Sequence, residues 1–273
     1  MSRTSWKTII PVGLFIVLTY IPFAFIVGNS VKSDAQIAQN PLSILWTFHV
    51  QNYEMAWNGI DRYLLNTVLV GLASVCVAIP FAAGAGYSFA SMNFRFKKVL
   101  FYCFIGLMMI PWSLTLIPLF VEIKNMGMYG TWWGLILPYA AGSQPLLIYL
   151  FRIFFEGIPD ELFESARIDG ASELRILVRI VSPMSLPVFV TGILLMFINI
   201  WGDYLWPSIV LPNYHLLTIS AGLQTFLGTF GYTGLGAGAA YAGYVIATLP
   251  IVIFVVAAMR NFINGITAGS MKG

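Results

Sequence analysis

Residues 158–183 read IPDELFESARIDGASELRILVRIVSP, a dense cluster of charge in a chain of which only 9% of residues are charged. Apolar residues at the start of this stretch recur at the spacing of one helix face. They are Ile158, Leu162, Phe163 and Ala166. The stretch therefore predicts an amphipathic helix.

Residues with strong local preferences divide the same stretch into two helices. Pro159 suits the first helical position, and the two acids that follow it suit the positive end of the helix dipole. Gly170 breaks the run, and Ser172 can cap a second short helix that stops before Pro183. The prediction is a helix-break-helix with an exposed apolar face, suited to docking a soluble partner.

A second interpretation of the amphipathic pattern is a helix that lies on the membrane surface. The acidic residues of the stretch argue against it, because an anionic lipid surface would repel them and attract basic residues instead. They are Asp160, Glu161, Glu164, Asp169 and Glu173. Docking of a partner protein is therefore the favoured interpretation.

The rest of the chain has the composition of an integral membrane protein. Of its 273 residues 59% are hydrophobic, too many for a soluble globular protein. Uncharged runs of about 20 residues or more predict six spans. Their expected ranges are 8–27, 63–90, 99–121, 131–151, 186–206 and 237–259. We expect one all-α transmembrane domain over 1–273, with a core at about 63–260, an N-terminal span and the helix-break-helix loop at 158–183.

Basic residues set the expected orientation. With a cytoplasmic N-terminus, eleven of the fourteen Lys and Arg residues lie inside, as the positive-inside rule requires. The inside residues are Arg3, Lys7, Arg95, Lys97, Lys98, Arg152, Arg167, Arg175, Arg179, Arg260 and Lys272, and the outside ones are Lys32, Arg62 and Lys124. Both termini and the stretch 158–183 would then face the cytoplasm from the cell membrane.

The stretch resembles the EAA loop of binding-protein-dependent ABC importer permeases. That loop has Glu-Ala-Ala, three residues, Gly, nine residues, Ile, any residue and Leu-Pro. The matching positions here are Glu164-Ser165-Ala166, Gly170, Ile180 and Pro183, with departures at Ser165 (usually Ala) and Ser182 (usually Leu). The run ARIDGA at 166–171 is typical of the carbohydrate-uptake branch, and the tail 265–273 resembles the smaller maltose-type permease subunit.

The resemblance implies a non-catalytic permease subunit of an ATP-driven sugar importer. Its partners would be a second permease, two ABC ATPase subunits that bind ATP and Mg, an extracytoplasmic solute-binding protein, a sugar and membrane lipid. Glu164 would engage a basic residue of the ATPase, the apolar face would fill the ATPase cleft, and Gly170 would allow the bend. The residues implied in ATPase coupling are Leu162, Phe163, Glu164, Ser165, Ala166, Asp169 and Gly170.

No motif for chemistry of its own occurs in the sequence. The P-loop pattern Gly-x-x-x-x-Gly-Lys-Ser/Thr is absent, so no cofactor is expected in this chain. His49 and His215 lie in expected external loops without the spacing of a metal site. Cys76 and Cys103 fall within spans, where we interpret them as buried free thiols that act as small apolar residues. The net charge of +3 is too small to indicate nucleic acid.

Polar and aromatic side chains within the spans are candidates for a translocation path. They are Asn66, Trp112, Gln144, Asn199, Trp201 and Asp203. A charge at mid-membrane is costly enough to imply function, but Trp and Tyr beside Asp203 place it at an interface, where a structural role is equally open. For the other residues, helix packing and interface anchoring are the alternative roles.

Two classes of transporter fit these features. A secondary transporter would show internal repeats and ionisable residues at the midplane, where Asp203 is the one candidate. An ABC permease needs neither, and it is the favoured class. The expected solute is a neutral oligosaccharide, because the spans offer amide and aromatic side chains but no Lys or Arg to offset an anion.

Overall fold

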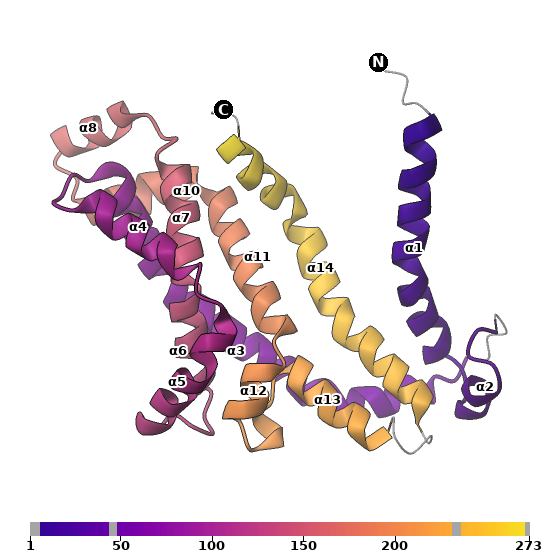
Figure 1. The fold of residues 1–273 in the computed structure, drawn as a ribbon. Coiled ribbons are helices and arrows are strands. Elements are labelled where there is room, and N and C mark those ends of the chain that lie inside the picture. Colours follow the sequence, from indigo (N-terminus) through magenta and orange to yellow (C-terminus); the bar gives the residue numbers. More distant parts are fainter. Residues whose placement is uncertain (1–5, 44–47, 231–235, 271–273) are drawn as a thin grey trace. The chain divides into compact units, whose positions relative to one another are not determined.

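The computed structural model of the chain describes residues 6–43, 48–230 and 236–270. Within these ranges it is helical, with no strand, which confirms the predicted all-α class (Figure 1). The helices are α1 (Trp6–Ser30), α2 (Asp34–Gln39), α3 (Gln51–Ser91), α4 (Lys97–Leu107), α5 (Trp112–Asn125), α6 (Trp133–Gly142), α7 (Gln144–Phe155), α8 (Asp160–Ile168), α9 (Glu173–Ile176), the π-helical turn η1 (Leu177–Val181), α10 (Ser182–Met184), α11 (Leu186–Gly202), α12 (Leu205–Val210), the 3-10 turn η2 (Tyr214–Leu216), α13 (Ile219–Phe230) and α14 (Ala237–Ser270).

The chain divides into two compact units. The first consists of residues 1–64 and 222–250, and the second of residues 65–221 and 251–273. Helices α3 and α14 each begin in the first unit and end in the second. The single domain over 1–273 with a core at 63–260 stays a prediction.

Six candidate spans follow from the described helices when each bent pair counts as one. Three are single helices: 10–30 within α1, the whole of α3, and 237–259 within α14. The bent pairs are α4 with α5 (95°), α6 with α7 (42°), and the helix 173–184 with α11 (84°). Proline lies at each bend, because it cannot donate to a continuing helix: Pro111 precedes α5, Pro145 opens α7 and Pro187 opens α11.

Helix α3 is longer than the predicted second span. Expected from residue 63, it begins at Gln51 and has 41 residues, so at 1.5 Å per residue it extends about 60 Å, roughly twice the hydrocarbon thickness of a bilayer. Asp61 and Arg62 are exposed on its surface. The polar composition of residues 28–62, between the first two expected spans, predicts one external loop. That prediction was wrong, because charged residues mark where a helix leaves the membrane and not where the helix begins.

In the first unit, hydrogen bonds from polar side chains join neighbouring segments near the start of α3. The Asn52 amide, which is buried, donates to the carbonyls of Ser30 at 2.9 Å and Lys32 at 2.8 Å. The Asp34 carboxylate accepts from the backbone N–H groups of Gly236 at 2.6 Å and Gly238 at 3.0 Å. The end of α1, α2 and the start of α14 are thereby held together within this unit.

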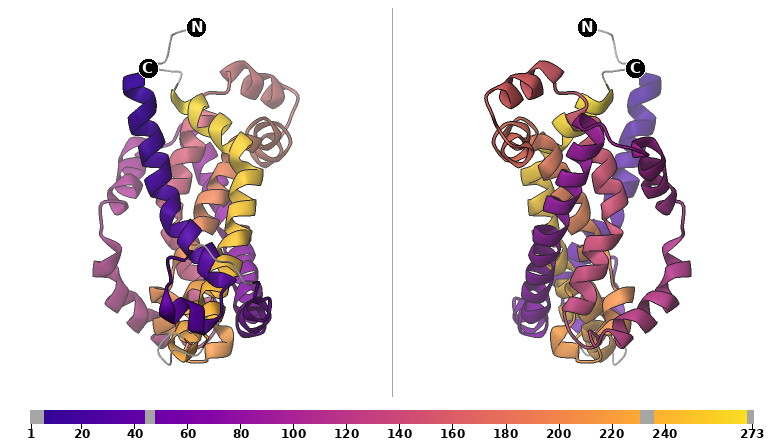
Figure 2. Two further views of the ribbon diagram at one scale, coloured as in Figure 1. Left: turned by 90° about the vertical axis from the view of Figure 1, so that its right-hand side faces the viewer. Right: turned by 90° about the vertical axis from the view of Figure 1, so that its left-hand side faces the viewer.

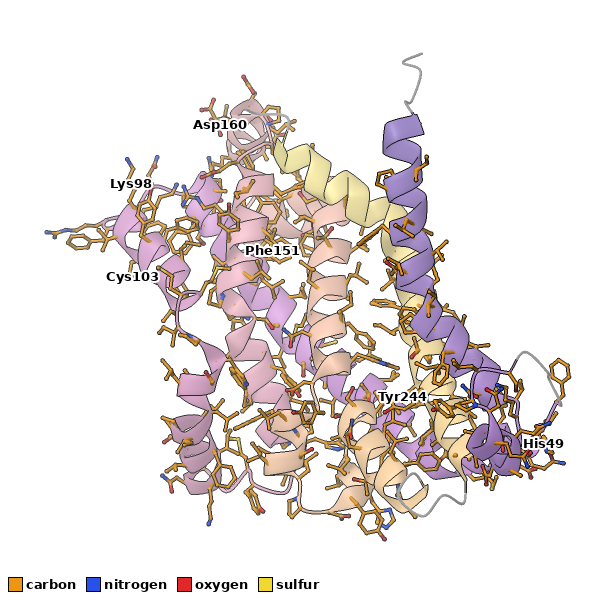
Figure 3. All side chains as sticks on the ribbon, turned by 45° about the vertical axis from the view of Figure 1, so that its right-hand side comes forward. His49, Lys98, Cys103, Phe151, Asp160 and Tyr244 are labelled. Atoms are coloured by element: carbon orange, nitrogen blue, oxygen red, sulfur yellow. The ribbon has the colours of Figure 1, made fainter. Side chains whose placement is uncertain are left out.

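Close packing of α3 on α7 organises the second unit. A Cβ added at Gly86 would lie 2.5 Å from Phe151 Cβ and 3.1 Å from the backbone nitrogen of Arg152, whereas one added at Gly84 would meet nothing within 4 Å. Phe151 is fully buried, and its ring centroid lies 4.6 Å from that of Phe189 on α11 (Figure 3). Helices α7 and α11 lie side by side in both orientations shown (Figures 1 and 2). The run of small residues at 82–86, AAGAG, is typical of close helix packing, and Gly86 is where α3 approaches α7.

Candidate coupling segment and translocation cavity

The coupling segment comprises residues 158–183 and contains α8 near its start. Helix α8 lies at one extremity of the second unit (Figure 1). The helix starts at Asp160, one residue later than predicted, with Pro159 as the residue before it. Asp160 and Glu161 occupy the first turn, where the helix dipole favours negative charge. Asp160 points away from the rest of the unit (Figure 3).

A glycine-dependent turn separates α8 from α9. Gly170 has φ +76°, the left-handed region that side chains disfavour. Its N–H donates to the Arg167 carbonyl at 3.0 Å, and the N–H of Ala171 donates to the Ala166 carbonyl at 3.0 Å. These two bonds form a Schellman motif. The Ser172 hydroxyl then accepts from the Arg175 N–H at 3.4 Å and caps α9, so the predicted break and cap are confirmed.

The second helix does not stop before Pro183, and that prediction was wrong. The helix continues from α9 through the π-helical turn η1 into α10, which ends at Met184. The Leu177 carbonyl accepts from both the backbone N–H and the hydroxyl of Ser182, the latter at 2.7 Å. The wider turn shifts the bonding from i−4 to i−5 immediately before the proline, which lacks an N–H of its own.

The apolar face of α8 lies largely against its own chain. Phe163 is 2% exposed and Ala166 is buried, and the Phe163 ring centroid lies 6.0 Å from that of Tyr87 on α3. The prediction of an exposed face was wrong for these residues, since a periodic pattern cannot say what covers a face. Leu162 is 37% exposed and Ile168 is 86% exposed. Of the other predicted coupling residues, Glu164, Ser165, Asp169 and Gly170 are exposed.

A polar cluster that the sequence did not indicate joins α3 to both helices of the segment. Arg167 donates from Nε to Glu173 Oε1 at 2.8 Å and from Nη2 to Oε2 at 3.3 Å. The Tyr87 hydroxyl also donates to Glu173 Oε2. Both carboxylate oxygens of Glu173 therefore accept hydrogen bonds from neighbouring side chains. Residues six apart across a helix break follow no helical period, and nothing in the sequence marks Tyr87.

The second unit also holds a cavity of about 500 Å³. Residues from α5, α6, α7, α11 and the loops beside them line it. They are Trp112, Pro138, Tyr139, Gly142, Ser143, Leu146, Leu147, Leu195, Met196, Asn199, Ile200, Gly202 and Asp203. Three of the predicted path residues, Trp112, Asn199 and Asp203, meet here although α5 and α11 are far apart in sequence. The cavity is mainly apolar with a few polar groups, as ligand sites usually are.

The other predicted path residues lie outside the lining and bond within the protein. Asn66 donates to the carbonyls of His215 at 2.8 Å and Leu217 at 2.9 Å. Gln144 donates to the carbonyls of Ala78 at 3.2 Å and Ala140 at 2.9 Å. Trp201 is buried, with its ring centroid 5.7 Å from that of Phe197. These contacts give all three side chains a packing role.

Asp203 shapes the cavity wall. Its Oδ1 accepts from the backbone N–H groups of Leu205 at 3.0 Å and Trp206 at 3.2 Å, at the start of α12. Its Oδ2 accepts from the hydroxyl of Tyr139, on α6, at 2.9 Å. The carboxylate therefore links α6 to the start of α12, which is the structural role left open by the sequence.

Comparison with known proteins decides the transport class. The model of the family "Binding-protein-dependent transport system inner membrane component" matches residues 78–267. This chain belongs to that family. The permease is 34% identical to YurM of Bacillus subtilis (strain 168), a probable ABC transporter permease, over 99% of this chain and 91% of the relative. It is 32% identical to AraQ of the same strain, an arabinooligosaccharide transport system permease, over 81% and 78% of the two chains.

A solved structure shares the fold of the permease. A chain of a bacterial ABC transporter involved in the import of the acidic polysaccharide alginate superimposes with a TM-score of 0.82. The match covers 96% of this chain and 99% of that one, at 20% sequence identity. The permease is thus a multi-pass membrane component of an ABC importer, a class that works with an ATPase and a solute-binding protein, and the alternative of a secondary transporter is set aside. Among the described residues no group of His, Cys, Asp and Glu has the arrangement of a metal site.

Replacing Asp203 separates its charge from its capping role. Asp203→Ala removes both backbone bonds and the Tyr139 bond, so we expect a loss of about 0.5–2 kcal/mol in the free energy of unfolding. Asp203→Asn retains an acceptor for the N–H groups and an amide for Tyr139, so the loss should be smaller. The melting temperature of the purified importer complex measures both. An equal loss in the two variants would show that the negative charge matters and the cap does not.

Proposed function

We propose that this permease translocates a neutral oligosaccharide delivered by an extracytoplasmic solute-binding protein. It would act with a second permease and two ATPase subunits, which bind ATP and Mg, while this chain holds no cofactor. The cavity is the observation that supports this substrate class, because its polar groups can form hydrogen bonds with a hydroxyl-rich ligand. The relative AraQ, named for arabinooligosaccharides, supports the same class.

The cavity offers what a sugar requires. Asn199 lines the cavity, and its side chain makes no hydrogen bond within the described residues. Its amide oxygen and its amide NH2 group are therefore both available to sugar hydroxyls. Trp112 and Tyr139 add aromatic surface against which the apolar face of a sugar ring can pack. Asp203 is the one charged residue in the lining, and both of its oxygens already accept hydrogen bonds. No cation among the lining residues offsets an anionic ligand.

Uptake by cells that produce the whole importer tests the substrate class. We expect accumulation of at least one of maltotriose, trehalose and arabinotriose, and none of an alginate trisaccharide. An unpaired charge at mid-membrane costs about 2.5–3.5 kcal/mol, which corresponds to about a hundredfold in binding. Cells without this permease serve as the control. Uptake of the acidic trisaccharide with no uptake of the neutral sugars would contradict the proposal.

The coupling segment is the proposed docking site for the ATPase. Its exposed apolar side chains include Leu162, Ile168 and Leu174, and the exposed acids Glu164 and Asp169 lie beside them. Such a surface combines apolar contact with charge that can steer and orient a basic partner. Buried Phe163 and Ala166 would instead fix α8 to the permease.

The docking proposal requires the segment to face the cytoplasm. Single cysteines replacing Asn93 and the exposed Ile168 should react with a membrane-impermeant thiol reagent only from the cytoplasmic side, and one replacing exposed Leu42 only from outside. The native Cys76 and Cys103 are exposed in the structure, so the prediction that they are buried was wrong, and both must first be replaced. Labelling at position 168 in intact cells would invert the orientation inferred from the eleven-to-three distribution of basic residues.

A further inference from the structure

Tyr87 is a buried tyrosine near the end of α3 whose hydroxyl reaches out of the helix bundle to the coupling segment. Its ring packs on Phe163 of α8, and its hydroxyl bonds the carboxylate of Glu173, the first residue of α9. One side chain of α3 therefore touches both helices of the segment, on either side of the Gly170 turn.

Glu173 is shared between two donors from different helices. Arg167, in the last turn of α8, holds it through two parallel N–H···O bonds, a geometry that fixes orientation as well as distance. Because Tyr87 bonds one of the same carboxylate oxygens, a rotation of α8 against α9 displaces the acceptor of the Tyr87 hydroxyl.

Contacts continue from Tyr87 toward the cavity. Its neighbour in sequence, Gly86, packs directly on Phe151 and Arg152 of α7. Leu147, one helical turn before Phe151 on the same helix, lines the cavity. A displacement of the end of α3 therefore acts on the helix that forms part of the cavity wall.

We propose that Tyr87, Glu173 and Arg167 form a positioning cluster that transmits movement of the coupling segment to α3 and, through Gly86, to the α7 wall of the cavity. The proposal rests on the docking of an ATPase at this segment. The Arg167–Glu173 ion pair is about two-fifths exposed, so it contributes little to stability, and its removal leaves the Tyr87–Phe163 packing in place.

Hydrogen exchange in the whole importer complex measures the transmission directly. The complex is purified through a tag on this chain, and exchange is compared without nucleotide and after trapping with MgATP and vanadate. In the unsubstituted complex, trapping should change exchange both in α8 (Asp160–Ile168) and at the end of α3 (84–91). In Tyr87→Phe and in Glu173→Ala, the change in α8 should persist while the change at 84–91 falls about threefold or more.

Two comparisons give this experiment its control. Glu156→Ala removes a carboxylate from another partly exposed ion pair, Arg152 Nε to Glu156 Oε1 at 2.7 Å, and should leave both changes as in the unsubstituted complex. The double variant Tyr87→Phe/Glu173→Ala should lose no more than Glu173→Ala alone, because both single substitutions remove the Tyr87–Glu173 hydrogen bond.

The outcomes separate this proposal from the docking on which it rests. An unsubstituted complex whose α8 does not respond to trapping overturns the docking and the cluster together. Variants whose α3 responds as in the unsubstituted complex overturn the cluster alone. Loss of the α8 response in the variants would show that the cluster holds the docking surface and transmits nothing, which also overturns the proposal.

Discussion

Gly170→Pro should uncouple transport from ATP hydrolysis while the spans remain inserted. Proline requires φ near −65°, whereas Gly170 has φ +76°, and proline also lacks the N–H that bonds the Arg167 carbonyl. The Schellman turn cannot form, so α8 and α9 lose their fixed angle and the Arg167–Glu173 pair loses its geometry. We expect substrate-stimulated hydrolysis and transport to fall about 5- to 150-fold, the usual range of a coupling free energy.

A graded series at the same position separates backbone conformation from size. An added Cβ at Gly170 meets no atom within 4 Å, so only the left-handed conformation penalises a side chain. Asparagine tolerates this conformation and should stay close to the unsubstituted protein, while alanine should lose about 1–2 kcal/mol in the turn. The measurement is ATPase activity of the reconstituted complex with and without loaded binding protein. Stimulated hydrolysis in the proline variant equal to that of the asparagine variant would refute the role of this turn.

Gly86→Ala should destabilise the permease, whereas Gly84→Ala should not. The new methyl at residue 86 would lie 2.5 Å from Phe151 Cβ and 3.1 Å from the Arg152 backbone, atoms that move only if α3 and α7 separate. Overpacking of this kind costs about 1–3 kcal/mol. Gly84 faces open space on the same helix, so alanine there should be neutral or slightly stabilising.

The paired design removes the effects of composition and helix propensity. Both variants make the same chemical change in one helix two residues apart, so a difference in melting temperature between the two purified complexes reports helix contact. The yield of assembled complex gives a second measure. Equal shifts in the two variants would mean that α3 and α7 do not pack at Gly86 as the structure has them.

The sequence by itself determined the fold class and the break at Gly170. Long uncharged runs predict helices that cross a membrane, because backbone groups in lipid find no water and must form their hydrogen bonds within the segment. The break was predictable because it depends on local chemistry. Gly170 adopts a conformation that other residues resist, and the Ser172 hydroxyl caps the helix within three residues of itself.

Local patterns also explain where the predictions failed. Pro183 indicated a helix end, but the π-helical turn and the Ser182 hydroxyl accommodate it. Asp61 and Arg62 indicated a loop, but a helix carries charges freely on an exposed surface. At both places the residues have the local preference expected of them, but their surroundings in the folded structure determine the outcome.

Tertiary structure alone decided which residues meet. Periodicity assigns Phe163 to an apolar face, but the fold alone places Tyr87, 76 residues earlier, against it. Likewise Trp112, Asn199 and Asp203 line one cavity because the bends at Pro111 and between α10 and α11 bring distant helices together, while Asn66 and Gln144 bond backbone carbonyls elsewhere. Burial and pairing depend on contacts between segments far apart in sequence, and no local pattern encodes those distances.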